Sequence, residues 1–425
     1  MQPTVKFDRT LVTVLVDEVL HVLLELAAPP AAPVERAPLD VVVVLDRSGS
    51  MSGAPLASVT AATSQLLRLA GSDDRIGVVA FDDTVQLVLP LATHQADPAA
   101  ATVLAIGAGG STNLSGGWLK GLEMLTGSPR AGALRRIIVL TDGHANVGLS
   151  TADVLVPLIK SGYQQGVTTS CIGFSDNYDE QLLAALADGG MGNEYWCAGP
   201  DQAAKVFADE FGGLASVVAQ NVSVEITPSA AVAATAVLNE FPVTDVPGGL
   251  QVALGDAYGG EKRKVVARFH LRPSSTTGQV EVATLTIRWA AVVGDVALHT
   301  VTVPVVVTVG DGSGPDTGAD AAVTEEVLRL QVARTRKEAR DAAERGDYNT
   351  ASAMMTAGAD LAECLPDELR MVRELRLDAE ALMTQTWTAT DAKRNFSRSR
   401  SASKGRRTDY VAEPVAEPEG DDTVS

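Results

Sequence analysis

Hydrophobic and polar positions follow three different patterns along the chain. Near the N-terminus apolar and polar residues alternate over Val5–Leu15 and Val19–Leu26, which predicts two strands. From Asp40 onward, short apolar runs alternate with segments of helical spacing, the pattern of a doubly wound, mostly parallel α/β sheet with helices on both faces. From Val222 onward, β-rich segments separated by turn residues predict an antiparallel β-domain of modest size.

Two runs of the α/β region are typical of central strands. Val41–Leu45 is an unbroken apolar run, mostly of β-branched valines, that is followed by Asp46, and Arg136–Thr141 is similarly followed by Asp142. Continuous runs of this kind suit strands that are buried on both faces, as in a parallel sheet. Both predicted strands therefore carry a carboxylate at their carboxyl ends.

The remaining elements of the α/β region follow from spacing and turn residues. Strands at 75–81 and 85–89 are separated by two aspartates, which predicts a hairpin and one antiparallel strand at this edge of the sheet. We expect further strands at 168–173 and 194–198, and helices at 56–69, 98–106, 114–125, 152–161, 179–187 and 202–219.

These patterns divide the chain into six segments. They are N-terminal strands (1–38), the α/β domain (39–219), a β-sandwich-like domain (220–309), a Gly-rich linker (310–322), a helical hairpin or bundle (323–388) and a tail (389–425). The N-terminal strands abut the start of the α/β domain as the later strands abut its end. We therefore expect them to join the β-domain, which makes the α/β domain an insertion in it. The tail is rich first in Ser and Arg and then in acids and Pro, so we expect it to be disordered.

Composition narrows the class of partner. The 425 residues include 53 acids and 34 bases, a formal net charge of −19. This balance disfavours broad nucleic-acid binding and favours cationic partners or metal ions.

The N-terminal region and the cysteines bear on location. The first ten residues lack the basic and apolar regions of a signal peptide, and Leu11–Leu26 is too interrupted by charge to span a membrane. Cys171, Cys197 and Cys364 lie too far apart for a disulfide or metal motif. We expect buried free thiols and a cytoplasmic protein.

Three loops carry the residues that could bind a metal ion. The segment DRSGSMSG supplies Asp46, Ser48 and Ser50, GGSTNL supplies Thr112, and TDG supplies Asp142. In a doubly wound sheet, loops at the carboxyl ends of neighbouring strands meet at one crevice. Two carboxylates and three hydroxyls are hard donors that suit Mg²⁺, with Mn²⁺ or Ca²⁺ as alternatives. They leave a position open for a carboxylate of a partner protein.

These three motifs closely resemble the metal-ion-dependent adhesion site of the von Willebrand factor type A domain, in the family's order and spacing. The resemblance covers residues 39–219 and implies that Ser48, Ser50 and Thr112 bind metal through their hydroxyls. It implies that Asp46 and Asp142 bind the metal directly or through water. The arrangement of segments is similar to bacterial cytoplasmic proteins of this family and loosely to inter-α-trypsin inhibitor heavy chains. Bacterial relatives are often paired with MoxR-type AAA+ ATPases.

The function we predict is an intracellular, metal-dependent protein-binding module. The alternative is a structural scaffold or an adaptor for a MoxR-type AAA+ ATPase, in which the metal only rigidifies the fold. We expect no enzyme, since no His lies beside a reactive Ser or Cys in sequence and no phosphate-binding Gly-rich loop is present. An aspartyl-phosphate mechanism would need a second Asp where Ser48 stands.

Overall fold

We describe a computed structural model of the chain, over residues 1–31, 36–142, 145–174, 178–197, 200–275, 277–292, 297–311, 319–366 and 368–404. The chain forms two compact units, which meet in sequence between Leu328 and Arg329. Each unit is described separately below.

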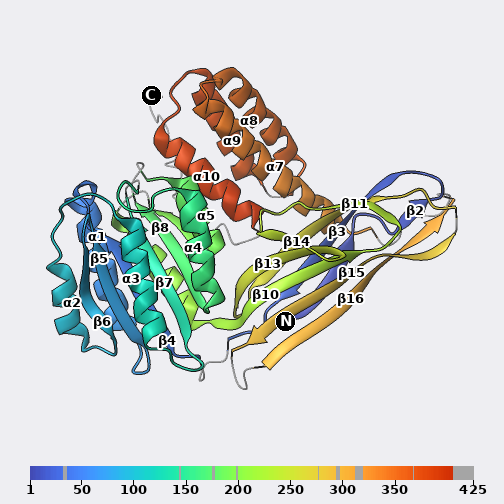
Figure 1. Cartoon of the computed structure of the whole chain (residues 1–425). Helices are drawn as coiled ribbons and strands as arrows, with labels where there is room; N and C mark the ends of the chain where they lie inside the picture. The colour runs from blue at the N-terminus through green and yellow to red at the C-terminus, as the bar shows by residue number, and fades with distance from the viewer. Residues whose placement is uncertain are drawn as a thin grey trace, which may run out of the picture. The chain divides into compact units, whose positions relative to one another are not determined.

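A six-stranded sheet forms the α/β part of the first unit (Figure 1). Its strands, in spatial order, are β6 (Val85–Ala92), β5 (Arg75–Phe81), β4 (Leu39–Asp46), β7 (Leu134–Thr141), β8 (Val167–Phe174) and β9 (Met191–Cys197). All neighbouring pairs are parallel except β5 and β6. The predicted doubly wound sheet with one antiparallel edge strand is confirmed.

Helices cover both faces of this sheet. Every residue of β4 is buried although alternate side chains point to opposite faces, so each face is covered. Val41 and Val43 pack into the same core as helices α1, α2 and α6, whereas Val42 and Val44 pack with α3, α4 and α5. The helices are α1 (Ala54–Leu69), α2 (Ala96–Leu104), α3 (Leu114–Gly127), α4 (Ala152–Gln164), α5 (Glu180–Gly189) and α6 (Pro200–Ala215).

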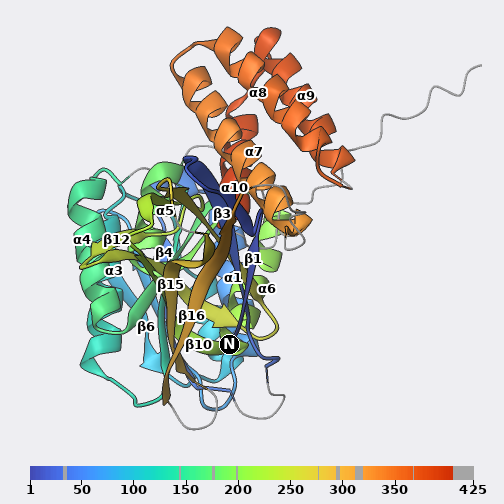
Figure 2. The ribbon, with the colours of Figure 1, turned by 90° about the vertical axis from the view of Figure 1, so that its right-hand side faces the viewer.

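Two mostly antiparallel sheets share a second apolar core and form a β-sandwich (Figure 2). One has the order β1 (Gln2–Phe7), β3 (Glu18–Ala27), β14 (Lys262–Leu271) and β11 (Val232–Val237). The other has the order β12 (Val243–Val246), β13 (Gly249–Tyr258), β10 (Val217–Pro228), β15 (Gly278–Ala291), β16 (Ala297–Gly310) and β2 (Leu11–Thr13).

The N-terminal strands do join this β-sandwich, as predicted. Strand β3 pairs with β14 along its full length, so the α/β domain is inserted between two parts of one sheet. The predicted strand Val5–Leu15 is in fact two strands. Residues 11–13 leave the first sheet and pair in parallel with β16 of the second.

The end of the α/β domain differs from the prediction. Helix α6 ends at Ala215, and β10 begins at Val217, inside the predicted helix 202–219. The β-branched Val217 already pairs with Tyr258 of β13, so strand pairing overrides the helical spacing.

Four helices follow the β-sandwich: α7 (Ala321–Glu344), α8 (Tyr348–Glu363), α9 (Leu369–Met383) and α10 (Ala389–Ser403). Helix α10 contradicts the predicted disorder from residue 389. Its first turn is closed by a capping box between Thr388 and Asp391, and Asp378 of α9 accepts hydrogen bonds from Arg394 and Asn395. Polar contacts therefore order a segment that has few apolar residues to bury. Residues 405–425 of the predicted tail lie outside the described residues.

Two further expectations concern the exposure of the cysteines and the presence of membrane-spanning helices. All three cysteines are free, and Cys171 and Cys197 are buried as expected, but Cys364 is exposed and the prediction of a buried thiol there is wrong. Within the described ranges, the structure has no helix that is long and apolar enough to cross a membrane.

Candidate metal centre

Asp46 is the last residue of β4 and is fully buried at the carboxyl end of the central strand. Its Oδ1 accepts a hydrogen bond from the main-chain N–H of Ser48 at 2.8 Å. Its Oδ2 accepts a hydrogen bond from the hydroxyl of Thr141, the last residue of neighbouring β7, at 2.5 Å. The carboxylate is thus held by both central strands.

Ser48, Ser50 and Asp142 extend this arrangement into one hydrogen-bonded chain. Ser48 and Ser50 flank Gly49 at the 3₁₀ turn Gly49–Met51, and their hydroxyl oxygens are 3.2 Å apart. The hydroxyl of Ser50 donates to Oδ1 of Asp142 at 2.7 Å, although the two residues are 92 positions apart in sequence. The structure therefore brings together four of the five predicted ligands.

Thr112 reaches the same end of the sheet through main-chain contacts. It is buried in the loop before α3, and the carbonyl of nearby Gly110 accepts a hydrogen bond from the N–H of Gly49 at 3.1 Å. Gly110 has a φ of +67°, and a Cβ there would lie 1.9 Å from Oδ1 of Asp83. Glycine therefore suits this position, where the Thr112 loop lies against the turn between β5 and β6. No described side-chain contact links Thr112 to the other four residues.

Electrostatics favour a cation at this position. Burial raises the pKa of Asp46, and the charge of Asp142 adds to the rise, although hydrogen bonds from Thr141 and Ser48 oppose it. Burial likewise raises the pKa of Asp142, against the hydrogen bond from Ser50. Neither carboxylate forms an ion pair with any described residue. Two neighbouring buried carboxylates with no positive partner are costly, and a divalent cation would compensate them.

The donor set fits a hard divalent ion. Among the residues that the structure describes, no group of three or more His, Cys, Asp or Glu is placed to hold a metal ion, so hydroxyls must complete any site here. Carboxylate and hydroxyl oxygens are donors that suit Mg²⁺, Mn²⁺ or Ca²⁺ rather than a soft metal. Gly143 of the TDG motif lies outside the described residues.

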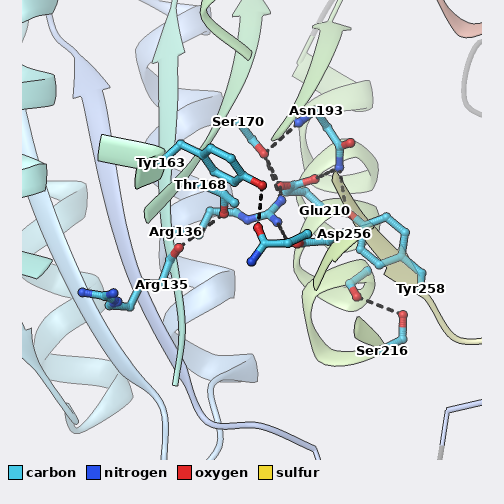
Figure 3. Close-up of polar contacts among 12 residues, drawn as sticks. Arg135, Arg136, Tyr163, Thr168, Ser170, Asn193, Glu210, Ser216, Asp256 and Tyr258 are labelled. Carbon is cyan, nitrogen blue, oxygen red and sulfur yellow. Dashed lines mark hydrogen bonds and ion pairs between the residues drawn. The ribbon is translucent and has the colours of Figure 1, made fainter. Parts of the chain in front are cut away.

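A second cluster of buried charge, at the opposite end of β7, was not predicted (Figure 3). The guanidinium of Arg136 bonds to Oε1 of Glu210 on α6 and to Oδ2 of Asp256 on β13, each at 2.8 Å. It therefore joins the α/β sheet, its last helix and the β-sandwich. The only sequence signal is a charged residue next to an apolar run.

Neutral donors complete this cluster around Glu210. Ser170 donates to its Oε1 at 2.5 Å, and Asn193 donates to its Oε2 at 2.7 Å (Figure 3). Tyr195 also donates to Oε2 at 2.7 Å. Burial acts to raise the pKa of Glu210, but the charge of Arg136 and these hydrogen bonds outweigh it, so the pKa is lowered. We refer to Arg136, Glu210, Asp256, Ser170 and Asn193 as the base network.

Sequence comparisons identify relatives over the α/β part of the chain. The model of the von Willebrand factor type A domain matches residues 40–207. The E3 ubiquitin-protein ligase WAV3 of Arabidopsis thaliana is 29% identical over 60% of this chain and 33% of that protein. The uncharacterized protein sll0103 of Synechocystis sp. is 30% identical over 46% of each chain. The inter-α-trypsin inhibitor heavy chain H3 of Mesocricetus auratus is 27% identical over 38% of this chain and 19% of that protein. The matches thus span at most about half the length of these relatives.

Solved structures share the fold over nearly the whole chain. A von Willebrand factor type A protein from Catenulispora acidiphila has a TM-score of 0.71 at 18% identity, covering 88% of this chain and 89% of its own. The ArnB paralog VWA2 from Sulfolobus acidocaldarius has a TM-score of 0.64 at 17% identity, covering 95% and 98%. At these identities the likeness concerns the fold alone.

Proposed function

Residues 40–207 are a von Willebrand factor type A domain, and from this premise we propose that the chain is a metal-dependent protein-binding module. Domains of this family are generally protein-interaction modules. The finer proposal is that Asp46, Ser48, Ser50, Thr112 and Asp142 hold Mg²⁺, and that an Asp or Glu of a partner protein supplies a further ligand. Mn²⁺ or Ca²⁺ could replace Mg²⁺ with the same donors.

The observation that carries this proposal is the uncompensated pair of buried carboxylates. Asp46 and Asp142 are both buried, and each accepts hydrogen bonds from hydroxyl groups rather than from basic side chains. Hydroxyl ligands donate little charge, so an ion that binds them directly and Asp46 or Asp142 through water would stay attractive to a further carboxylate. An incoming carboxylate would interact strongly with it, because the site is partly removed from water.

Metal binding is tested by calorimetric titration of Mn²⁺ and Mg²⁺ into the full chain. We expect one site in the wild type and none in Asp46→Ala. The matched control is Asp97→Ala, because Asp97 is an exposed carboxylate on α2 in the same domain. Equal heats in wild type and Asp46→Ala would refute the site, and circular dichroism would confirm that each variant folds.

Carboxylate recognition needs a separate experiment. Selection of displayed peptides on the immobilised full chain in Mg²⁺ should enrich sequences that contain Asp or Glu. EDTA or Asp46→Ala should abolish the enrichment, and amide replacement of the acid in a selected peptide should abolish binding. Binding that survives EDTA would favour the alternative of a scaffold or ATPase adaptor.

The cellular location and the absence of catalysis are part of the proposal. We propose an intracellular protein without enzymatic activity, and no activity is inferred from the ubiquitin ligase, since its match spans 33% of that protein. A Mg²⁺-dependent phosphatase turnover that Asp46→Asn abolishes would contradict this proposal.

A further inference from the structure

Thr112 differs from the other four predicted ligands, because no described side-chain hydrogen bond joins it to them. Asp46, Ser48, Ser50 and Asp142 are joined by side-chain hydrogen bonds. The position of Thr112 instead depends on what fixes its main chain. A metal ligand has to be held to within about 0.5 Å of its productive position, so this support determines how well the hydroxyl can serve.

Asn146, in the loop after β7, provides that support. Its side-chain Oδ1 accepts a hydrogen bond from the N–H of Thr112 at 2.8 Å. In the reverse direction, the N–H groups of Asn146 and Val147 both donate to the carbonyl of Thr112 at 3.2 Å. The peptide groups on both sides of Thr112 are therefore fixed by one short segment.

The same segment is attached to the start of α3. The hydroxyl of Ser115 accepts a hydrogen bond from the N–H of Leu149 at 3.0 Å and lies 3.2 Å from Oδ1 of Asn113, to which it donates. Asn113 in turn caps α3. Gly148 has a φ of +73°, and a Cβ there would lie 2.6 Å from both side chains. The loop that carries Asn146 is thus held closely against the Thr112 loop.

We propose that Asn146 is a positioning residue for the Thr112 hydroxyl in the metal site. This inference rests on the proposed function. Asn146 itself is exposed and belongs to no apolar core, so its acceptor oxygen is the main thing that a substitution removes. Without that acceptor, one of the three hydrogen bonds that orient the Thr112 main chain is lost. Outer-shell partners of this kind change metal affinity by about 10- to 100-fold.

The test compares Mn²⁺ affinity in wild type, Asn146→Ala, Thr112→Val and the double variant. We expect Asn146→Ala to weaken binding about tenfold. If Asn146 acts through Thr112, the same substitution should have no further effect in the Thr112→Val background. The water ligands of bound Mn²⁺, counted by electron spin echo in D₂O, should rise by one in both single variants. A purely structural role would not change that count.

Conservative and control variants separate the explanations. Asn146→Asp keeps an acceptor at the same place, so its Mn²⁺ affinity should be at least that of the wild type. Gln86→Ala removes an exposed amide from β6 of the same domain and should leave the affinity unchanged.

Two failures can be distinguished. If the wild type binds no Mn²⁺, the proposed function fails. If the wild type binds Mn²⁺ but Asn146→Ala binds equally well, or weakens binding equally with and without Thr112, the role of Asn146 is refuted and the proposed function stands.

Discussion

Buried carboxylates lie near both ends of strand β7, but within the described residues only those at its start are paired with a basic side chain. At its start, Arg136 bonds to Glu210 and Asp256, so two carboxylates have a cation from the chain itself. Just past its end, Asp142 approaches Asp46 through Ser50 and Thr141, and no described basic side chain joins them. The first cluster is complete as folded. The second has no cation among the described residues, and we propose that a metal ion from solution supplies it.

This difference predicts opposite signs for the same chemical change. In the base network, replacing a carboxylate by an amide of the same shape removes a negative charge that compensates the buried guanidinium of Arg136, so stability should fall. At the candidate metal centre, the same replacement removes one of two negative charges that repel each other, so stability without metal should rise.

In the experiments below, EDTA is present unless a metal is named. Trp387→Phe removes the tryptophan of the helical unit, so that fluorescence reports on residues 1–328.

The largest effect is expected for Glu210→Gln. It leaves Arg136 with one carboxylate and places an amide N–H₂ among the donors Ser170, Asn193 and Tyr195. Breaking a buried ion pair typically costs about 3–5 kcal/mol. We expect a loss of about 3 kcal/mol in the free energy of unfolding by urea. The control Glu225→Gln breaks an exposed pair with Arg288 and should cost about 1 kcal/mol or less. Similar losses in both variants would show that the base network contributes no more to stability than an exposed ion pair.

Addition of Mg²⁺ should give the next largest effect. A ligand that binds only the folded state stabilises it by about 2.7 kcal/mol at a concentration 100 times its Kd. We expect this gain in the wild type and also in Glu210→Gln, because the base network lies at the other end of β7. Asp46→Ala should show no gain. A gain in Asp46→Ala would show that the ion acts elsewhere on the protein.

The sequence predicted the convergence of Asp46 and Asp142 but not the base network, for a physical reason. Ligands at the carboxyl ends of parallel strands are brought together by the topology alone, so Asp46 and Asp142 could be placed once β4 and β7 were recognised. The partners of Arg136 come from α6 and from a strand of the other domain. The hydrophobic pattern places Arg136 in the correct strand, but it contains no information on that tertiary contact.

Elements of the fold were likewise predicted where they carry a local hydrophobic pattern and missed where tertiary polar contacts order them. Strand Arg75–Phe81 is predicted to the residue, because burial leaves a strong local pattern. Helix α10 was missed, because it is ordered by the polar contacts of Arg394 and Asn395 with Asp378 rather than by an apolar face. Asn146 was missed for a similar reason. Its role depends on one side-chain oxygen in a loop, and no periodicity marks it.

A smaller effect of opposite sign is expected for Asp142→Asn without metal. The substitution keeps an acceptor for the Ser50 hydroxyl and removes one of two buried charges that no described cation balances. We expect the free energy of unfolding to rise by about 1 kcal/mol, the usual size of a single-site effect. In saturating Mg²⁺ the order should reverse, since the wild type gains from the ion and the variant does not. A loss of stability in EDTA would contradict the view that these carboxylates are uncompensated.

The smallest effect concerns Tyr163 of α4, whose hydroxyl donates to Oδ1 of Asn221 at 2.5 Å beside the base network (Figure 3). Burial, together with the charge of Asp256, raises the pKa of Tyr163 from 10.0 to about 12. Because the folded state binds this proton more tightly than the unfolded chain, the contribution is fully present below pH 10 and is lost as the pH rises toward 12. Discounted for partial exposure, it amounts to less than about 1 kcal/mol. Urea unfolding of wild type and Tyr163→Phe should therefore give a constant difference near neutral pH and a steeper alkaline decline in the wild type. Parallel alkaline declines would show that folding does not raise the pKa of Tyr163.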